Sequence, residues 1–399
     1  MTITYRPAYS SVEDLVPYSA GKPIEEVARE MGLTRIVKLA SNENPMGMSP
    51  LAVEAMNRAA AGVNRYPDGA GWDLKGKLSE MLEVPRENIV LGNGSNEILE
   101  LLAQLLLTEG DETLYAWPAF VVYRLATLAH GGKGIEVPLD RNLKHDLDAM
   151  ADALTDRTRI VYIANPNNPT GTYVGRDELE RLMDRVPENV PLVLDEAYFE
   201  FASHIEDFPD GMEYFRQGRP IVVVRTFSKA HGLAGLRVGY AVMPEPLADL
   251  LNRVRQPFNV NSMAQAAAIA ALDDNDFVQR GLDHNRKELR RIQDAVESIG
   301  LTVTPSFTNF ILIDLGGRSG QDVYEGLMKK GVIVRSMAPY GLPGTIRVTA
   351  GLTEENDMFL EALQEVIGEM RDSKLVIRNS QTADLPITSH DSQIAVIKR

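Results

Sequence analysis

The residues best suited to chemistry lie in one segment, from Thr226 to Arg237, directly after the apolar run Ile221–Arg225. The run has the composition of a buried strand, so Lys229 should lie just beyond the strand's carboxyl end, where α/β folds bind ligands. A buried, desolvated lysine is a candidate Schiff-base nucleophile. Thr226, Ser228 and Arg237 add two hydroxyls and a guanidinium, which suit a phosphate. The alternative is a solvated lysine in a glycine-rich loop.

Two more segments with polar side chains follow predicted strands. Asn165–Gly171 reads Asn-Pro-Asn-Asn-Pro-Thr-Gly after the strand Ile160–Ala164, and its Asn-Pro steps force an extended, turned backbone whose amides can donate hydrogen bonds. Asp195 follows the strand Pro191–Leu194. A carboxylate at a buried strand end needs donors or a cationic partner, such as a protonated ring nitrogen. The alternatives are a plain turn and a helix-capping aspartate.

A glycine-rich segment, Gly92 to Glu97, leads into the predicted helix Ser95–Leu107. Free N–H groups and the positive dipole end at such a helix start favour an anion. The segment is neither a Walker A loop nor a full dinucleotide fingerprint, and alone it is a weak signal. Together the four segments supply a nucleophilic lysine, a carboxylate, donors to a ring oxygen and a phosphate cup. Pyridoxal 5′-phosphate requires this set.

Short apolar strands alternating with helical segments must position these side chains. Such strands argue for a mostly parallel sheet covered on both faces, in a large α/β domain over residues 45–275. Its other predicted elements are Thr113–Ala116, Val238–Met243 and the helix Asp177–Arg185.

A smaller α+β domain is predicted over residues 276–370, entered through one long helical stretch, Ser262–Ile299. The elements expected there are strands Leu301–Thr304, Asn309–Asp314, Val332–Arg335 and Thr345–Thr349, and helices Gln321–Lys330 and Glu354–Met370. An N-terminal arm, residues 1–44, has no core of its own and should pack on the small domain or on a partner subunit. Residues 371–399 are expected to form a flexible or loosely docked tail.

Composition narrows the function further. The 399 residues are 44% apolar and 24% charged, as in a folded globular protein, and the net charge of −15 disfavours nucleic-acid binding. There is no cysteine, which excludes disulfides, cysteine metal sites and a cysteine nucleophile, and we predict no metal. No signal-like N-terminus and no apolar run of about 18 residues is present, so we expect no membrane association and a cytoplasmic location.

The order and spacing of these motifs resemble fold-type I, pyridoxal-phosphate-dependent aminotransferases, and above all the histidinol-phosphate aminotransferase family. The resemblance runs from about Tyr18 to Leu363. Besides the four segments, it is carried by Pro23–Glu30, Leu39–Pro45, Arg65–Asp68, Val254–Asn261, Thr308–Phe310 and Ile346–Gly351.

The resemblance implies a role for each matching residue. Lys229 would bond to the cofactor as a Schiff base, Asp195 would pair with the pyridinium nitrogen, and Asn168 and Tyr198 would contact the ring 3′-oxygen. Arg347 would hold the substrate α-carboxylate and Arg335 its far end. Phe120 would stack on the pyridine ring, and Tyr66 would reach the phosphate from the partner subunit of a homodimer with shared active sites. The remaining phosphate ligands would be Ser95, Asn96, Thr226, Ser228 and Arg237.

These roles form a consistent chemistry. A carboxylate beside the ring nitrogen keeps it protonated, which makes the ring a better electron sink. The freed Lys229 amine can then move a proton as general acid and base. Bidentate carboxylate binding by Arg347 would fix which bond at Cα reacts. The sequence departs from the family at His231, where an aromatic residue is usual and which we interpret as a packing substitution, and in its longer tail.

Three functions remain open at this point. The first is transfer of an amino group from histidinol phosphate to 2-oxoglutarate, in histidine biosynthesis. The second is a similar aminotransferase acting on aromatic or other amino acids. The third is a pyridoxal-phosphate lyase or decarboxylase of the same fold. The segment Gly331–Arg335 followed by Tyr340–Pro343 favours the aminotransferases.

Overall fold

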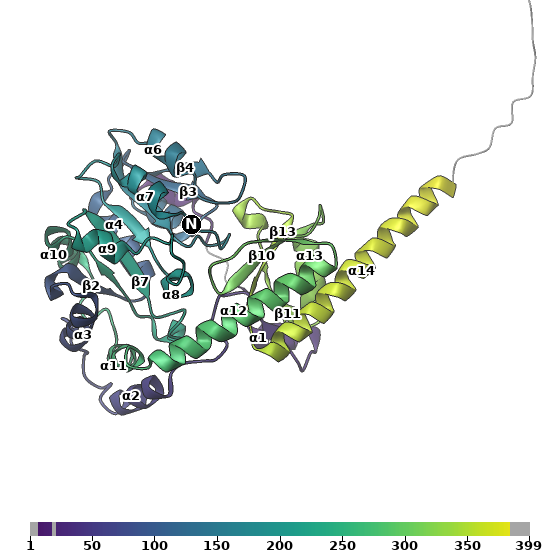
Figure 1. Ribbon diagram of the computed structural model, residues 1–399, viewed down its shortest axis with the longest axis horizontal. Coiled ribbons are helices and arrows are strands. Elements are labelled where there is room, and N and C mark those ends of the chain that lie inside the picture. The colour runs from purple at the N-terminus through teal and green to yellow at the C-terminus, as the bar shows by residue number, and fades with distance from the viewer. Residues whose placement is uncertain (1–6, 18–20, 384–399) are drawn as a thin grey trace, which may run out of the picture.

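The computed structural model describes residues 7–17 and 21–383, with the backbone alone for residues 372–383. Two sheets with their helices lie side by side (Figure 1). We call the seven-stranded sheet and its covering helices the large unit, and the four-stranded sheet and its helices the small unit. The domain boundaries at residues 44, 275 and 370 stay predictions.

The sheet of the large unit is parallel except at one strand. β8 runs antiparallel to both of its neighbours, β2 and β7, and the other pairs are parallel. In spatial order the strands are β2 (Ile89–Gly92), β8 (Gly239–Val242), β7 (Ile221–Thr226), β6 (Leu192–Asp195), β5 (Thr158–Ala164), β3 (Glu112–Trp117) and β4 (Lys133–Pro138).

Helices cover both faces of this sheet. Its central strands carry apolar side chains on both faces, and these must be shielded from water. Alternate residues divide between two apolar clusters, as Val161 and Ile163 face one cluster and Ile160 and Tyr162 the other. The first face is covered by α2 (Pro50–Ala60), α3 (Trp72–Leu82), α6 (Leu147–Asp152), α7 (Arg176–Met183), α9 (Gly211–Arg216) and α11 (Ser262–Ala271). The second is covered by α4 (Ser95–Leu106), α5 (Val122–Ala129) and α10 (Glu245–Val254).

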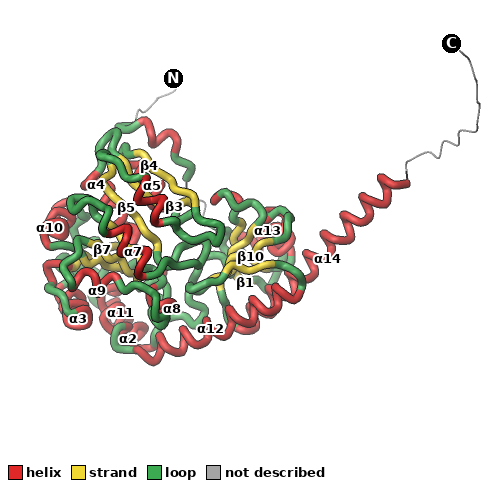
Figure 2. The backbone as a smooth tube through the Cα atoms, turned by 45° about the horizontal axis from the view of Figure 1, so that its top comes forward, coloured by secondary structure: helices red, strands yellow, loops and turns green. Residues whose placement is uncertain are grey.

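The small unit is an antiparallel sheet packed against long helices. Its spatial order is β12 (Arg335–Ser336), β13 (Thr345–Thr349), β10 (Phe310–Asp314) and β9 (Thr302–Thr304). The helices are α12 (Asn275–Ser298), α13 (Gly320–Lys329) and α14 (Thr353–Ala383). Figure 1 shows α12 running from the large unit to the small one, and Figure 2 shows α14 extending away from the body.

The N-terminal arm touches both units. Its helix α1 (Ile24–Met31) is followed by β1 (Val37–Lys38), which pairs with β11 (Val332–Ile333) of the small unit. Earlier in the arm, η1 (Ser10–Asp14) lies on α5, where the Ser11 hydroxyl donates to the Leu128 carbonyl at 2.7 Å. The remaining elements are the short helices η2 (Arg86–Asn88), α8 (Phe199–Ala202), η3 (Ala234–Leu236) and η4 (Ala338–Tyr340).

Three predicted elements are corrected by the structure. The single helical stretch Ser262–Ile299 is two helices, because Asp274 accepts from the Phe277 N–H and so caps a new helix start. The strand Val332–Arg335 is split between β11 and β12. The last helix continues past Met370 to Ala383, since no glycine or proline ends it there. The predicted tail is therefore helical at its start, and its remainder, 384–399, lies outside the described residues.

Within the described residues, no helix is long and apolar enough to cross a membrane.

Candidate active site

The candidate site is a cavity of about 460 Å³ at the edge of the large sheet where β5, β6 and β7 end. Asn168, Asp195 and Lys229 reach it from just beyond or at those three carboxyl ends. Arg347 of β13 faces them from the small unit. Eleven of the predicted site residues line this one cavity, and their full list is Ser95, Asn96, Phe120, Asn168, Asp195, Tyr198, Thr226, Ser228, Lys229, Arg237 and Arg347.

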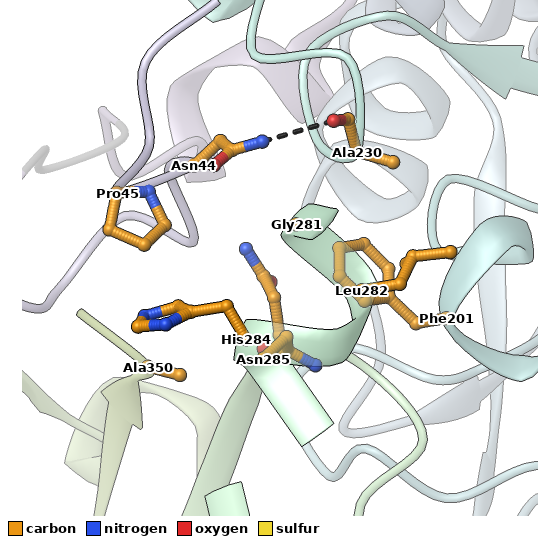
Figure 3. Close-up of a pocket in the computed structure, with 10 residues that line it drawn as sticks. Asn44, Pro45, Phe201, Ala230, Gly281, Leu282, His284, Asn285 and Ala350 are labelled. Atoms are coloured by element: carbon orange, nitrogen blue, oxygen red, sulfur yellow. Dashed lines mark hydrogen bonds between the residues drawn. The ribbon is translucent and has the colours of Figure 1, made fainter. Parts of the chain in front are cut away.

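A second, much smaller cavity of about 10 Å³ lies against Ala230, the residue that follows Lys229 in the chain (Figure 3). Asn44 closes it by donating to the Ala230 carbonyl at 3.0 Å, and His284 and Asn285 of α12 line it from below. This space is the size of one water molecule, so it cannot hold the predicted cofactor.

The phosphate end of the site is built by an antiparallel strand and a helix start. Because β8 runs against β7, its amino end lies at the same edge as Thr226 and brings Arg237 there. Gly94 has φ +75°, and a Cβ on it would overlap the Arg237 guanidinium, so a larger residue would be strained and would displace that side chain. Ser95 begins α4 beside it. Hydroxyls, a guanidinium and helix N–H groups are the donors that a phosphate dianion needs.

At the opposite end of the cavity, Asp195 is a buried carboxyl with too few donors for its charge. The Tyr123 hydroxyl donates to it at 2.8 Å and the Ala197 N–H at 3.2 Å. Burial nevertheless raises the pKa of Asp195 to about 6. A carboxyl in this state is stabilised by a cationic group placed next to it, as a protonated pyridine nitrogen would be.

Lys229 lies between these two ends. Its Nζ donates to the Asn42 carbonyl at 3.2 Å. Burial, together with the nearby charge of Arg347, lowers the pKa of Lys229 to about 8. A much larger share of the amine is therefore neutral near pH 8 than in a lysine with the ordinary pKa of 10.5, and a neutral amine is the form that attacks a carbonyl.

Tyr198 completes the site from the turn after β6. Its hydroxyl accepts from the Asn42 amide at 2.7 Å, and burial raises its pKa to about 12, so it stays protonated. On the facing side, Arg347 donates to the Asn168 amide oxygen and, at 2.9 Å, to the Ala40 carbonyl. These contacts hold the guanidinium of Arg347 over the cavity.

Two predicted residues do not line the cavity. Tyr66 is 83% exposed and stacks on Phe258 at 4.7 Å between ring centroids, outside the site. Arg335 pairs in register with Arg347 across β12 and β13, so the two side chains leave the same face of the sheet next to each other. His231, two residues past Lys229, packs on Phe227 at 5.1 Å and does not line the cavity either.

Sequence reasoning missed three residues of the site. Asn42 is hydrogen-bonded to both Lys229 and Tyr198, although it lies 156 residues before Tyr198 in the chain. In the sequence it stood out only as part of the family-like segment Leu39–Pro45. Tyr123, near the start of α5, donates to Asp195, and no local pattern marked it. Tyr340 lines the cavity from the small unit.

Comparison with known proteins agrees with this geometry. Residues 34–363 match the family described as "Aminotransferase class I and II". The chain belongs to this aminotransferase family. It is 50% identical over 362 residues to histidinol-phosphate aminotransferase 2 of Pseudomonas aeruginosa, covering 90% of this chain and 97% of that one. It is 46% identical over 370 residues to histidinol-phosphate aminotransferase 1 of Nitrosococcus oceani, covering 93% and 99%.

A solved relative supports the cofactor. The crystal structure of histidinol-phosphate aminotransferase from Sinorhizobium meliloti, in complex with pyridoxal 5′-phosphate, has a TM-score of 0.83 and 28% identity, covering 92% of this chain and all of that one. The predicted family, the fold class, the assignment as an aminotransferase and pyridoxal phosphate as cofactor are thereby confirmed. The roles of individual residues stay predictions.

Replacing Asp195 by asparagine should stabilise the cofactor-free protein at alkaline pH. The pKa is raised from 3.8 to about 6, so the folded chain holds an extra proton between those values and loses stability as pH rises through that window. Above it the charged carboxylate costs at most ~3 kcal/mol, which Asp195→Asn removes. Urea unfolding should show a more stable mutant at about pH 8 and no advantage near pH 4. An equal difference at both values would contradict this origin.

Proposed function

We propose that this chain transfers an amino group from histidinol phosphate to 2-oxoglutarate, the first function predicted from its sequence. The pair of arginines Arg335 and Arg347, directly opposite each other on β12 and β13, carries the proposal, because Arg347 lines the same cavity as Lys229. Two guanidinium groups at directly opposite positions of neighbouring strands supply planar donors and positive charge, which suit a doubly charged anion such as a phosphate. The relatives named histidinol-phosphate aminotransferase support the same donor.

The residues of the cavity divide the work of an amino transfer. When bound, pyridoxal phosphate supplies an electron sink that makes the Cα proton of the amino donor acidic. Asp195 keeps a proton on the ring nitrogen by charge pairing, and burial makes this pairing strong. Lys229 carries the proton to and from the reacting carbon, because its lowered pKa of about 8 lets the amine both take up and release a proton near neutrality.

Arg347 orients the donor by binding its anion. Its planar fork matches either a carboxylate or a phosphate, so one position can accept both partners of the reaction. Histidinol phosphate has a phosphate but no α-carboxylate, whereas glutamate, the product of 2-oxoglutarate, has two carboxylates. One set of guanidinium groups must therefore serve both anions.

A panel of amino donors tests the proposal. The loaded enzyme is mixed with histidinol phosphate, phenylalanine and glutamate in turn, and the visible absorbance of the cofactor is followed by stopped flow. Among the three donors, histidinol phosphate should give the highest second-order rate constant for the change in cofactor absorbance. A preference for phenylalanine would establish the aromatic aminotransferase instead, which the apolar side chains of Phe120, Val121 and Tyr340 in the cavity also allow. A cytoplasmic location stays a prediction.

Arg335→Ala should weaken kcat/KM for histidinol phosphate by at least about tenfold. Arg335 pairs with Arg347 across β12 and β13, and in this proposal the two guanidinium groups share the phosphate. Phenylalanine should lose much less, since its single carboxylate is held by Arg347 and it brings no phosphate for Arg335 to share. Steady-state kinetics with both donors, on wild type and mutant, measures this. Equal losses for the two donors would remove Arg335 from any specificity role.

We also propose a homodimer in which Tyr66 completes the partner's site. Tyr66 and Phe258 form an exposed aromatic stack, and Tyr66 does not line the cavity of its own chain. A phosphate ligand predicted at this position must then act across an interface. Large exposed aromatic side chains are typical of such interfaces.

Mixing inactive subunits tests the shared site. Tyr66→Ala and Lys229→Ala chains are unfolded together and refolded as hybrids. One site of each hybrid regains both residues, so about a quarter of all sites should become native at random pairing. Activity equal to the sum of the two parents would show that Tyr66 acts within its own chain.

A further inference from the structure

Tyr340 of the small unit closes one side of the active-site cavity. It ends η4, in the connection between β12 and β13, and only 8% of its surface is exposed. Its side chain lines the same cavity as Lys229 and Arg347. Its hydroxyl also lies near enough to Tyr198 to contribute to the raised pKa of that group.

The ring of Tyr340 lies on a side chain of the other unit. Trp117, the last residue of β3, stacks on it with 5.9 Å between centroids and an angle of 14° between the planes. Arg124 of α5 lies 5.7 Å from the same tryptophan ring. Leu312 and Met337 of the small unit and Val121 and Leu143 of the large unit pack around the pair. The stack is therefore an apolar contact between the two units at the edge of the cavity.

The strands on either side of Tyr340 carry the two arginines of the proposed anion site. Arg335 begins β12 and Arg347 lies in β13, and the two strands are paired in register. A donor whose anion binds the arginines thus lies beside the loop that carries Tyr340. The lining of the cavity includes polar and charged side chains, and Tyr340 with Val121 and Phe120 supplies apolar surface.

We propose that Tyr340 is a specificity-determining residue, whose ring, held by Trp117, packs against the unsaturated ring of the amino donor. This inference rests on the proposed function and adds to it how the donor's ring is recognised. The contact is made by the aromatic ring and not by the hydroxyl. A donor without a ring, such as glutamate, depends on the arginines alone.

Kinetics of Tyr340→Ala and Tyr340→Phe test the role. Removing the ring should raise KM for histidinol phosphate about five- to tenfold, with kcat changed less than about twofold, since an aromatic contact of this kind is worth about that factor. KM for glutamate should stay within about twofold. Tyr340→Phe keeps the ring and should behave as wild type with both donors. Equal losses for both donors, or a phenylalanine variant as impaired as the alanine variant, would overturn the proposal.

Tyr173→Ala is the matched control. Tyr173 of the large unit also makes an aromatic contact with the small unit, at 4.6 Å from Phe307, but it does not line the cavity. Its removal should leave both KM values unchanged. If it raises KM for histidinol phosphate as much as Tyr340→Ala does, the effect comes from loosened units and not from a donor contact, and the proposal fails.

Tryptophan fluorescence tests the stack without any donor. The chain has two tryptophans, so Trp72→Phe leaves Trp117 as its one tryptophan, which excitation at the red edge of the absorption band selects over tyrosine; Trp72 is 61% exposed, so its replacement should be tolerated. Adding Tyr340→Ala should increase the quenching of Trp117 by acrylamide, whereas Tyr340→Phe should not. Unchanged quenching would show that the stack does not form.

The two hypotheses fail in different ways. If wild type ignores histidinol phosphate but accepts phenylalanine, the proposed function is wrong, and the comparison of phenylalanine with glutamate then decides the role of Tyr340.

Discussion

Lys229→Ala should abolish turnover and leave the fold intact. The side chain is both the group that attacks a carbonyl and the group that moves the proton, so its loss should cost at least about 10⁴-fold in kcat. The fold should survive because the mutation removes a buried amine whose pKa is already lowered to about 8 by burial. The lysine was not stabilising the protein through a strong ion pair.

Stopped-flow turnover and circular dichroism together measure this prediction. The mutant should show the far-ultraviolet spectrum of wild type and no catalysis, and its visible cofactor band should be altered because the covalent bond to lysine is missing. Lys144→Ala is the control, since Lys144 forms an ion pair with Glu178 at 3.0 Å and does not line the cavity. Normal transamination by the purified Lys229→Ala protein would refute the assignment.

The central site could be predicted from sequence because its residues follow strands of strongly apolar composition. Lys229, Asp195 and Asn168 each come within a few residues of a buried run, and parallel strands bring their carboxyl ends to one edge. The family resemblance then assigned the roles. The local pattern alone left a capping aspartate or a solvated lysine open.

Other parts of the site depend on contacts that no local pattern encodes. Asn42 reaches Lys229 and Tyr198 only because the arm passes between the two units. β4 was missed because its edge-strand residues Lys133–Pro138 are largely exposed and lack an apolar run. Arg237 lies at the phosphate end because β8 is antiparallel, a direction that its own residues do not reveal.

The boundary errors have a similar origin. Ser262 to Ile299 is rich in helix-forming residues, and the break near Asp274 depends on one side chain that caps the second helix. The predicted end of helix α14 at Met370 rested on a change in composition and not on a glycine or proline stop signal, and the helix continues to Ala383. Propensity located these helices, but the start of α12 depends on the hydrogen bond from the Phe277 N–H to Asp274.

Arg347→Ala should weaken both halves of the reaction, unlike Arg335→Ala. Arg347 is 7% exposed, and its guanidinium donates to the Asn168 amide oxygen and the Ala40 carbonyl and lies 5.0 Å from the centroid of the Phe310 ring. Both histidinol phosphate and glutamate place an anion near the reacting carbon, so both lose their partner. Removing one member of a buried charge pair costs about 2–5 kcal/mol, or about 30- to several-thousand-fold in kcat/KM.

The decisive comparison is between Arg347→Ala and Arg347→Lys. Lysine keeps the charge but not the planar fork, so it should recover part of the binding and little of the orientation, leaving kcat low. The visible cofactor band should stay normal in both variants, because Lys229 is intact, and this separates their defect from that of Lys229→Ala. Steady-state and half-reaction kinetics with each donor measure these losses. Should Arg347→Ala cost less than about fivefold with both donors, another cation must hold the anion, and the side-by-side arginines would not be the site of donor recognition.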